Sequence, residues 1–496
     1  MMQELLYLSP LIIISIFSIL VLVVDGLARR SPNPVYYFAI LALVLTGASA
    51  IWTLTMPLPL TAGSQIFKYA ILFSKDRALF DIIFSAAGLL TVFSAREYLR
   101  REYSEFREFY TLILFAVTGM TLIAHAGNFI IIFLGVELMS IVFYVLAGFV
   151  RTREWSVEAS LKYFVLGSFS TGFLLYGMAL VFGATGAIDF YSINAALREG
   201  LFNQSYFKVG MGLILIGLMF KAAAFPFHQW APDVYTGAPT VVAGFMSTGG
   251  KSAALIGFMV IAREAIPHDY GVQSVTDALN TVNAMWKDIR DIIAWISAAT
   301  MIVGNITALA QKNIKRMLAY SSIAHAGYML IGLAADNGSG YGAIAFYSLA
   351  YVFMQLGSFT ALSIFERDYG KNLELKDFAG LSKRKPWLAA LMAVFMFSLV
   401  GLPPFAGFFG KYYLFLAAIE TGYTWLAIVG VIASIISIYY YIGVIVYMYF
   451  REPSEAEFAI PAGRGAGAAV TLSAVGLIVF GLLPFLFMDY ALAYFR

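Results

Sequence analysis

Long apolar runs of about 18 to 28 residues follow one another along almost the whole of this 496-residue chain. A helix of about 20 apolar residues crosses the ~30 Å hydrocarbon layer of a bilayer. The composition agrees, because 61% of the residues are hydrophobic and only 12% are charged. The runs therefore predict an all-α polytopic membrane protein and exclude a water-exposed globular enzyme.

A window of about 20 residues, moved along the sequence, predicts about fourteen transmembrane helices. The expected spans are residues 7–27, 35–56, 78–95, 109–126, 129–150, 160–183, 209–236, 240–262, 290–310, 317–335, 342–365, 387–420, 424–449 and 467–489. Nineteen of the 32 basic residues then fall in loops on one side, and nine fall on the other. Because basic loops stay in the cytoplasm, we expect both termini on the outer side of the membrane.

The sequence offers little for redox or metal chemistry. It contains no Cys, which removes disulfides, thiolate metal ligands and iron–sulfur ligation. Its four His residues are too scattered for a recognisable haem or zinc spacing. The net charge of +3 provides no basic stripe, so we expect no nucleic-acid partner. The aromatic residues, 16% of the chain, are expected mainly in lipid-facing packing and interface belts.

Four lysines and one glutamate stand out inside the predicted spans. An ionisable group at the centre of a membrane helix costs about 2.5 to 3.5 kcal/mol on insertion scales, so such groups indicate an ion path. We predict that Lys221, Lys251 and Lys411 belong to such an ion path. Glu137 needs an opposite charge nearby, and we expect it to pair with Lys221. Lys162 is a further candidate, but it lies close to the start of its span, where a lysine can instead extend its ammonium to the membrane surface.

The histidines divide into candidates for proton transfer and residues without an expected role. His325 is near the middle of its span with no charged residue within a turn, so we favour a relay role over that of a polar interior residue. His228 follows a predicted helix break, where a relay role and bonding to freed carbonyls are equally favoured. His125 ends a span and His268 lies in a loop, and neither is assigned a function. Asp81, near a span end, is expected to be hydrated.

Two predicted spans are too long for one straight helix. Residues 387–420 carry Pro403 and Pro404 at mid-length, and residues 209–236 carry Pro226 a few positions after a lysine. Because proline removes a helix hydrogen bond and clashes with the preceding turn, we expect the seventh and twelfth helices to break within the membrane. Non-helical backbone at that depth is tolerated only where protein buries it or where it lines a watery cavity.

The two broken helices are five helices apart, which predicts two inverted repeats of five helices each. Corresponding helices would cross the membrane in opposite directions, because five is an odd number. The expected units are residues 1–108 for helices 1 to 3, 109–263 for the first antiporter-like repeat, 264–450 for the second, and 451–496 for the last helix.

Four stretches carry a resemblance to a known family. They are SLKYFVLGSFSTGFLLYGMALVFGATG (160–186), FKAAAFPFHQWAPDVYTGAPT (220–240), NIKRMLAYSSIAHAGYMLIGL (313–333) and GLPPFAGFFGKYYLF (401–415). They resemble the chain N family of respiratory complex I, the bacterial NADH-quinone oxidoreductase, and the likeness extends over nearly the whole chain. The related M chains would carry Glu at the position of Lys411, and the L chains would continue into a long lateral helix.

The resemblance implies an antiporter-like proton channel that contains no cofactor. FMN, iron–sulfur clusters and quinone would belong to partner subunits, and quinone reduction there would drive the protons. The partners would be other antiporter-like chains and small membrane chains of the complex, in the lipid bilayer of a bacterial inner membrane.

The resemblance also assigns roles to individual residues. It implies that Glu137 pairs with Lys221, the helix 7 lysine. Lys162 matches the helix 6 lysine, Lys251 the helix 8 lysine, and Lys411 the helix 12 lysine near the exit. A lysine held in low dielectric can exchange a proton that a solvated lysine retains. The expected path therefore runs along these lysines, through ordered water or the histidine of the tenth span.

The alternative function is that of a subunit of a sodium/proton antiporter, which would use the same lysines without electron transport. Sodium-dependent proton flux in vesicles that lack a quinone reductase would favour it. Comigration with flavin and iron–sulfur subunits would favour the complex I function.

Overall fold

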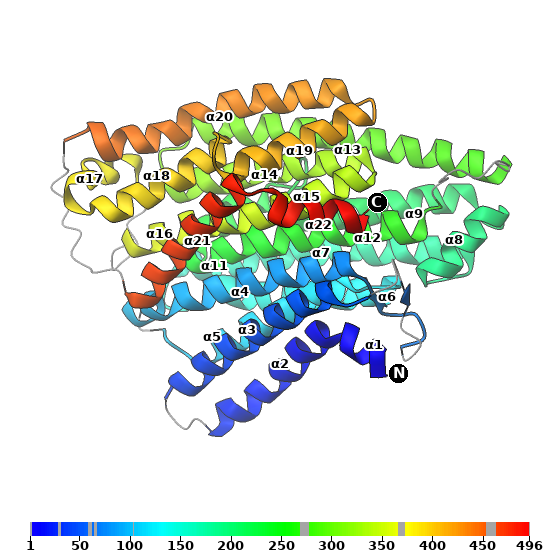
Figure 1. Ribbon diagram of the computed structural model, residues 1–496, viewed down its shortest axis with the longest axis horizontal. Helices are drawn as coiled ribbons and strands as arrows, with labels where there is room; N and C mark the ends of the chain where they lie inside the picture. Colours follow the sequence, from blue (N-terminus) through cyan, green and yellow to red (C-terminus); the bar gives the residue numbers. More distant parts are fainter. Residues whose placement is uncertain are drawn as a thin grey trace.

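The computed structural model describes residues 2–27, 31–57, 62–63, 67–102, 104–267, 277–365, 373–452 and 463–495. It confirms the predicted all-α membrane architecture (Figure 1). Within the described residues, twelve helices are long and apolar enough to cross a membrane. The count of fourteen crossings and the two inverted repeats stay predictions.

The first half of the chain forms helices that cover the first eight predicted spans, and one further helix, α8, lies between the sixth and seventh. They are α1 (Met2–Tyr7), α2 (Ser9–Leu27), α3 (Asn33–Thr55), α4 (Lys75–Arg101), α5 (Glu108–Ala124), α6 (Phe129–Ala147), α7 (Glu154–Thr185), α8 (Phe190–Glu199), α9 (Gln204–Ala222), α10 (Trp230–Gly237), α11 (Thr240–Phe245), the π-helical turn η1 (Met246–Gly250) and α12 (Lys251–Ala265). A short antiparallel pair, β1 (Ala62–Gly63) and β2 (Leu72–Phe73), precedes α4, with Ala62 opposite Phe73.

The second half continues in the same way. Its elements are α13 (Asp277–Leu309), α14 (Ile314–Ala335), α15 (Gly338–Tyr351), the π-helical turn η2 (Val352–Leu356), α16 (Gly357–Phe365), the 3-10 turn η3 (Leu375–Phe378), α17 (Leu381–Arg384), α18 (Pro386–Val400), α19 (Ala406–Glu420), α20 (Thr424–Phe450), α21 (Arg464–Leu482) and α22 (Phe485–Phe495). The last predicted span is divided between α21 and α22.

Several helices begin at Asn or Asp side chains that accept a hydrogen bond from the first turn. The side chains of Asn128, Asp189 and Asn203 do so for α6, α8 and α9. Asn313 and Asn337 do the same for α14 and α15. These caps satisfy amides that have no partner within the helix, which matters most where water is scarce.

Both predicted helix breaks are present. The first separates α9 from α10, and Ala223 after α9 adopts a left-handed conformation with φ of 55°. The second separates α18 from α19, and Gly401 ends α18 with φ of 89°, which favours glycine. The first break contains Pro226, and the second contains Pro403 and Pro404. A proline has no amide hydrogen to donate, so a regular helix does not continue through these positions.

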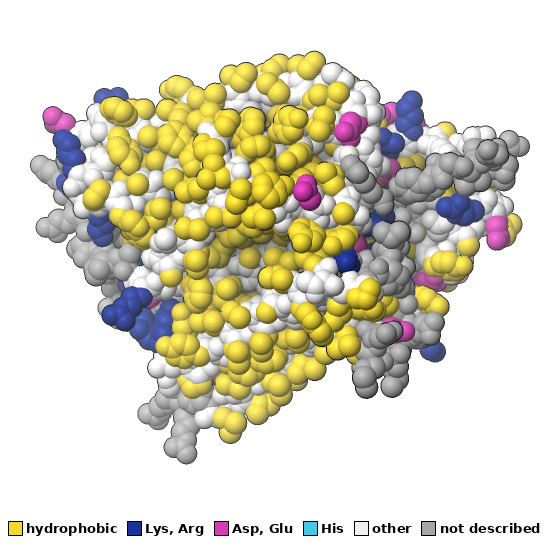
Figure 2. Space-filling view, viewed as in Figure 1, with side chains coloured by type: hydrophobic (Ala, Val, Ile, Leu, Met, Phe, Trp, Pro, Cys, Tyr) yellow, Lys and Arg dark blue, Asp and Glu magenta, His cyan; other side chains and the backbone are white. Residues whose placement is uncertain are grey.

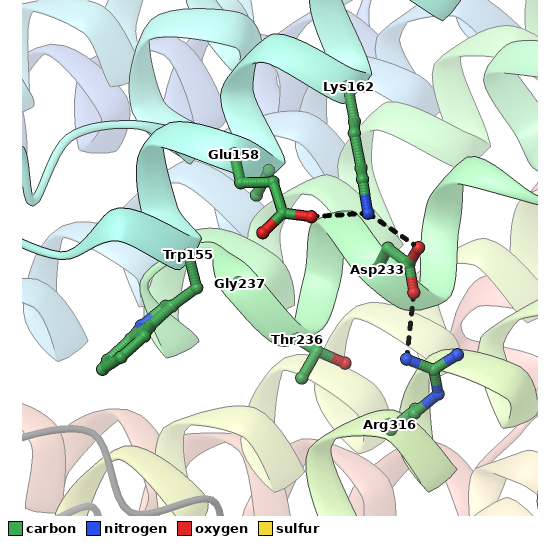
Figure 3. Close-up of a pocket in the computed structure, with 8 residues that line it drawn as sticks. Trp155, Glu158, Lys162, Asp233, Thr236, Gly237 and Arg316 are labelled. Carbon is green, nitrogen blue, oxygen red and sulfur yellow. Dashed lines mark hydrogen bonds and ion pairs between the residues drawn. The ribbon is translucent and has the colours of Figure 1, made fainter.

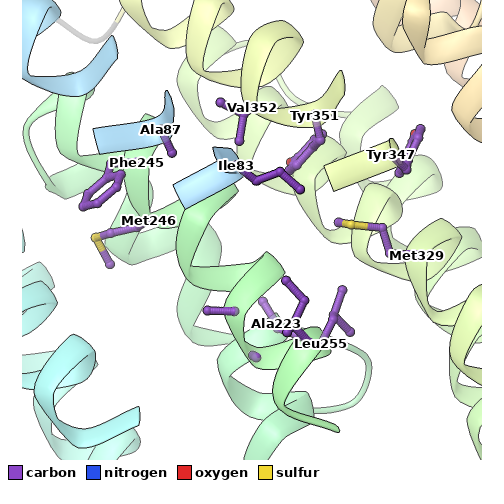
Figure 4. Packing of buried hydrophobic residues seen from close by; sticks show 14 of the residues in the cluster. Ile83, Ala87, Ala223, Phe245, Met246, Leu255, Met329, Tyr347, Tyr351 and Val352 are labelled. Atoms are coloured by element: carbon purple, nitrogen blue, oxygen red, sulfur yellow. The ribbon is translucent and has the colours of Figure 1, made fainter. Parts of the chain in front are cut away.

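The centre of the bundle is formed by three spans that are almost wholly enclosed by other helices. They are residues 240–265, α14 and residues 338–365. The turn η1 packs against η2 there, and α11 packs against α16. Figure 4 shows the apolar packing at this centre, where Phe245 lies beside Ala87 of α4, and Val352 and Tyr351 lie beside Ile83 of α4.

One face of the bundle is largely apolar between two charged ends (Figure 2). Figure 2 shows a broad hydrophobic face, with Lys and Arg gathered at the ends of the helices. α2 and α3 lie at one edge of the bundle and α20 at the opposite edge (Figure 1). This distribution is typical of a protein that faces lipid or other membrane subunits. Six basic or titratable residues used in the sequence analysis lie outside the described residues: Arg29, Arg30, His268, Arg367, Lys371 and Arg496.

Candidate functional site

Four of the predicted site residues are buried in the interior of the bundle. Their side chains come from α9, the junction of η1 and α12, α14 and α19. We call these four residues the buried row: Lys221, Lys251, His325 and Lys411, which are 3%, 0%, 1% and 4% exposed. Each of the four lies within a predicted span, and the structure encloses its side chain among other helices.

Lys221 lies in the last turn of α9, just before the break. Its ammonium donates a hydrogen bond to the Tyr144 hydroxyl at 3.1 Å. The same ammonium lies 5.3 Å from the centre of the Tyr144 ring and 5.8 Å from that of Tyr163. Both contacts stabilise a cation, one by hydrogen bonding and the other by the electrons of the ring face.

The expected ion pair between Glu137 and Lys221 is not formed. Within the described part of the chain, no oxygen of Glu137 lies within 4.0 Å of the Lys221 ammonium. The Glu137 carboxylate instead accepts a hydrogen bond of 2.7 Å from the Thr171 hydroxyl on α7, while Tyr144 occupies the contact position at Lys221. Tyr144 can take this contact in place of Glu137 because the two residues lie two turns apart on the same face of α6.

Lys251 is the first residue after the π-helical turn η1. Its ammonium donates to both the backbone carbonyl and the hydroxyl of Ser322, each at 2.8 Å. The centre of the Tyr235 ring is 5.7 Å away. A π-helical turn widens the helix by one residue and is often found at functional sites. Here the turn comes immediately before the fully buried lysine.

His325 lies in α14 about one turn beyond Ser322 and faces two tyrosines. Its Nδ1 is 2.6 Å from the Tyr347 hydroxyl, and its Nε2 is 3.0 Å from the Tyr441 hydroxyl. These two contacts join the imidazole on α14 to hydroxyls from α15 and α20.

Lys411 lies in the second turn of α19, just after the second break. Its ammonium donates to the carbonyls of Leu399 and Val400 at 3.1 and 2.9 Å. These carbonyls end α18, and the break leaves them without partners of their own helix. The Tyr328 ring centre is 4.5 Å from the ammonium. A cavity of about 270 Å³ with mostly apolar walls opens beside Lys411.

Lys162 does not join the buried row. It lies near the start of α7, and its side chain is 43% exposed. Its ammonium pairs with Glu158 at 2.7 Å and with Asp233 at 3.2 Å, and Arg316 reaches the other oxygen of Asp233 at 2.9 Å (Figure 3). These side chains line a surface cavity of about 260 Å³. The alternative interpretation, an ammonium that extends to the membrane surface, fits this position better.

His228 lies in the first break and is partly buried. Its ring centre is 5.6 Å from that of Phe225. Its Nδ1 is buried and has no hydrogen-bond partner in the described part of the chain. Among the described residues, the structure therefore joins His228 to no member of the buried row by a hydrogen bond.

Asp81 is not hydrated, contrary to the expectation from its position near a span end. It is 0% exposed, and its carboxylate lies 2.9 Å from Nε2 of His125. Nδ1 of His125 lies 2.9 Å from the Leu72 carbonyl. A neighbouring ion pair joins Arg77 to Glu264 at 2.7 Å. These side chains connect α4, the end of α5 and α12, which is a structural role that spacing along the sequence does not show.

The sequence analysis also missed the hydroxyl groups around the buried row. They belong to Tyr144, Ser321, Ser322, Tyr347 and Tyr441. The expectation that aromatic residues serve mainly at the lipid face hid the tyrosines. The available signal was a tyrosine or serine within an otherwise apolar span, close to an ionisable residue.

The chain is similar in sequence to a family of known membrane proteins. The family model for the transmembrane part of NADH:quinone oxidoreductase and Mrp antiporters matches residues 126–437. NADH-quinone oxidoreductase subunit N of Trichlorobacter lovleyi is 42% identical, over 97% of this chain and 95% of the relative. Subunit N 1 of Chloroherpeton thalassium is 40% identical, over 99% and 98%.

Solved structures give the same result. A chain of respiratory complex I from Thermus thermophilus with bound aureothin is 33% identical and superimposes with a TM-score of 0.80, over 97% of this chain and 98% of that one. A chain of the Mrp complex from Dietzia sp. shares the fold, with a TM-score of 0.84, 21% identity and coverage of 99% and 97%. The chain belongs to the NADH:quinone oxidoreductase/Mrp antiporter family of membrane proteins. The predicted resemblance to the N subunits is confirmed.

Proposed function

We propose that the buried row transfers protons across the membrane and that Glu137 controls the charge of Lys221 at its start. The chain is an antiporter-like, proton-translocating membrane subunit of the NADH-quinone oxidoreductase class, a function supported by 40 to 42% identity with N subunits. Its partners are the other membrane subunits of such a complex. FMN, iron–sulfur clusters and quinone would be held by partner subunits, whose redox chemistry would drive the protons.

The observation that carries this proposal is the burial of three lysines without counter-ions. Lys221, Lys251 and Lys411 are all less exposed than 5%, and among the described residues none pairs with a carboxylate within 4.0 Å. Hydroxyls, carbonyls and aromatic rings are their neighbours instead. An ammonium in such a place can exchange its proton when a nearby charge changes. Moving one proton against 100 mV requires about 2.3 kcal/mol, which modest electrostatic steps can supply.

The orientation and the internal division of the chain belong to the same proposal. Because the basic loops favour one side, both termini would lie on the outer side of a bacterial inner membrane. The two breaks support two inverted repeats, residues 109–263 and 264–450, flanked by residues 1–108 and 451–496.

The test is to change the charges at the start of the row in the assembled complex. Lys221→Ala and Glu137→Ala should strongly reduce proton pumping in inverted membrane vesicles and should reduce NADH-dependent quinone reduction less. Lys208→Ala is the matched control, because Lys208 lies on the same helix but pairs with Asp288 at the surface, at 2.6 Å. Full pumping in both variants would contradict the relay.

The second candidate, a sodium/proton antiporter subunit, rests on the fold shared with the Mrp chain. At 21% identity that likeness concerns the fold alone. Sodium-dependent proton flux in vesicles without any quinone reductase would favour this function, and copurification with flavin and iron–sulfur subunits would exclude it.

A further inference from the structure

Four side chains in the middle of the buried row form one continuous hydrogen-bonded chain. Nδ1 of His325 lies 2.6 Å from the Tyr347 hydroxyl, and Nε2 lies 3.0 Å from the Tyr441 hydroxyl. The Ser321 hydroxyl bonds the same Tyr441 hydroxyl. All four side chains are 1% exposed or less. We call them the hydroxyl–imidazole chain: Ser321, Tyr441, His325 and Tyr347.

Each member of this chain can both donate and accept a hydrogen bond. A serine or tyrosine hydroxyl has one proton and two lone pairs, and a neutral imidazole has one protonated and one free nitrogen. The three bonds can therefore point in either of two directions. In one, Ser321 donates to Tyr441, Tyr441 donates to Nε2, and the Nδ1 proton is donated to Tyr347. In the other, every bond is reversed.

The chain lies between two lysines of the row. At one end, Ser322 accepts both hydrogen bonds of Lys251 and is the neighbour in sequence of the first member. At the other end, the Tyr347 ring packs directly on Gly410, where an added Cβ would lie 2.2 Å from the ring. Gly410 precedes Lys411 in α19. Lysines alone cannot complete this connection, because a charged ammonium donates but does not accept.

We propose that the hydroxyls of Ser321, Tyr441 and Tyr347 pass the proton between Lys251 and Lys411, with His325 at the centre. This inference rests on the proposed function. The two tyrosines are then relay residues and not only packing residues.

The transfer balances without any oxidant or reductant. One proton binds the Ser321 oxygen, and the proton that this oxygen held moves to Tyr441. The Tyr441 proton moves to Nε2 of His325, the Nδ1 proton moves to Tyr347, and Tyr347 releases its own. One proton enters, one leaves, and all three hydrogen bonds have reversed. Reorientation of the hydroxyls and a change of tautomer at His325 restore the first direction.

The experiment removes single hydroxyls and keeps the rings. Tyr441→Phe and Tyr347→Phe, each in the assembled complex in inverted vesicles, should lower the initial rate of proton pumping by about tenfold or more, in line with the effect of removing a proton-transfer group. Tyr110→Phe is the matched control, since the Tyr110 hydroxyl is also buried and has no hydrogen-bond partner among the described residues. It should pump like the unmodified complex.

Comparison with Lys251→Ala separates this inference from the proposed function. If Lys251→Ala stops pumping while both tyrosine variants pump fully, the relay through the tyrosines is wrong and the row still stands. If Lys251→Ala pumps fully, the proposed function itself fails. Loss of pumping in Lys251→Ala and in both tyrosine variants, with Tyr110→Phe unaffected, supports both.

A second variant provides the test if the phenylalanine variants do not assemble into the complex. Replacement of Tyr441 by a fluorinated tyrosine keeps the hydroxyl and the ring but makes the phenol more acidic. The alkaline limb of the pH profile of pumping should then move to lower pH. A purely structural role of Tyr441 would leave the profile in place, and that result would overturn the proposal.

Discussion

Replacement of Gly167 by alanine tests whether the Tyr144 hydroxyl controls Lys221. Gly167 lies on α7, where the Tyr144 side chain of α6 crosses it. An added Cβ would lie 2.2 Å from the Tyr144 hydroxyl oxygen, whereas ordinary contact begins near 3.4 Å. The hydroxyl would therefore have to move by at least about 1.2 Å. Since the bond from Lys221 is already 3.1 Å long, such a shift is sufficient to break it.

The magnitude follows from two contributions. Overpacking of a tight contact costs about 1 to 3 kcal/mol, and loss of a hydrogen bond to a charged group costs about 1.5 to 3 kcal/mol. Removal of a glycine from a helix interior returns about 0.5 to 1 kcal/mol. We therefore expect Gly167→Ala to lower the free energy of unfolding by about 2 to 5 kcal/mol. Proton pumping should fall with it, although no charged residue has changed.

The assay is a double-mutant cycle with Tyr144→Phe, read by thermal stability and by proton pumping. Without the hydroxyl oxygen the closest clash disappears, so the double variant should be more stable than the sum of the single effects, by about 1 to 3 kcal/mol. Gly172→Ala is the matched control on the same helix, because an added Cβ there meets nothing within 4 Å. Additive effects, together with normal pumping in Gly167→Ala, would refute the reasoning.

Two further predictions concern charges outside the buried row. His125→Ala removes the imidazole that lies 2.9 Å from the buried carboxylate of Asp81. The free energy of unfolding should therefore fall by about 3 to 5 kcal/mol. Unchanged thermal stability would show that the pair contributes nothing. Asp233→Asn removes the carboxylate that Lys162 and Arg316 share, and these two side chains are 43% and 38% exposed. The free energy of unfolding should therefore fall by less than about 1 kcal/mol, and this effect should vanish in high salt. A larger, salt-independent loss would argue against a surface cluster.

The elements along the chain were predictable because lipid imposes strict local rules. Each helix must satisfy its own backbone, so the length of an apolar run predicts a span and proline predicts a break. The breaks at Pro226 and at Pro403 and Pro404 follow directly. The burial of Lys251 and His325 was predictable in the same way, since an ionisable group far from both ends of a span has to avoid lipid.

The contacts between helices were not predictable by such rules. Lipid and protein interior are both apolar, so an apolar helix does not reveal which of its faces turns inward. For that reason the sequence could not place Asp81 in the interior or Lys162 at the surface. It also could not show that Tyr144, and not Glu137, would meet Lys221.

The amino-acid sequence by itself therefore determined the membrane class, the two breaks and the burial of the mid-span residues Lys251 and His325. Only the tertiary structure decided which side chains meet, because that depends on the rotation and spacing of helices far apart in the chain. The hydrogen bonds of His325 show the difference most directly. Its partners are Tyr347 on α15 and Tyr441 on α20, and the packing of those helices around α14 brings the hydroxyls within 3.0 Å of the ring.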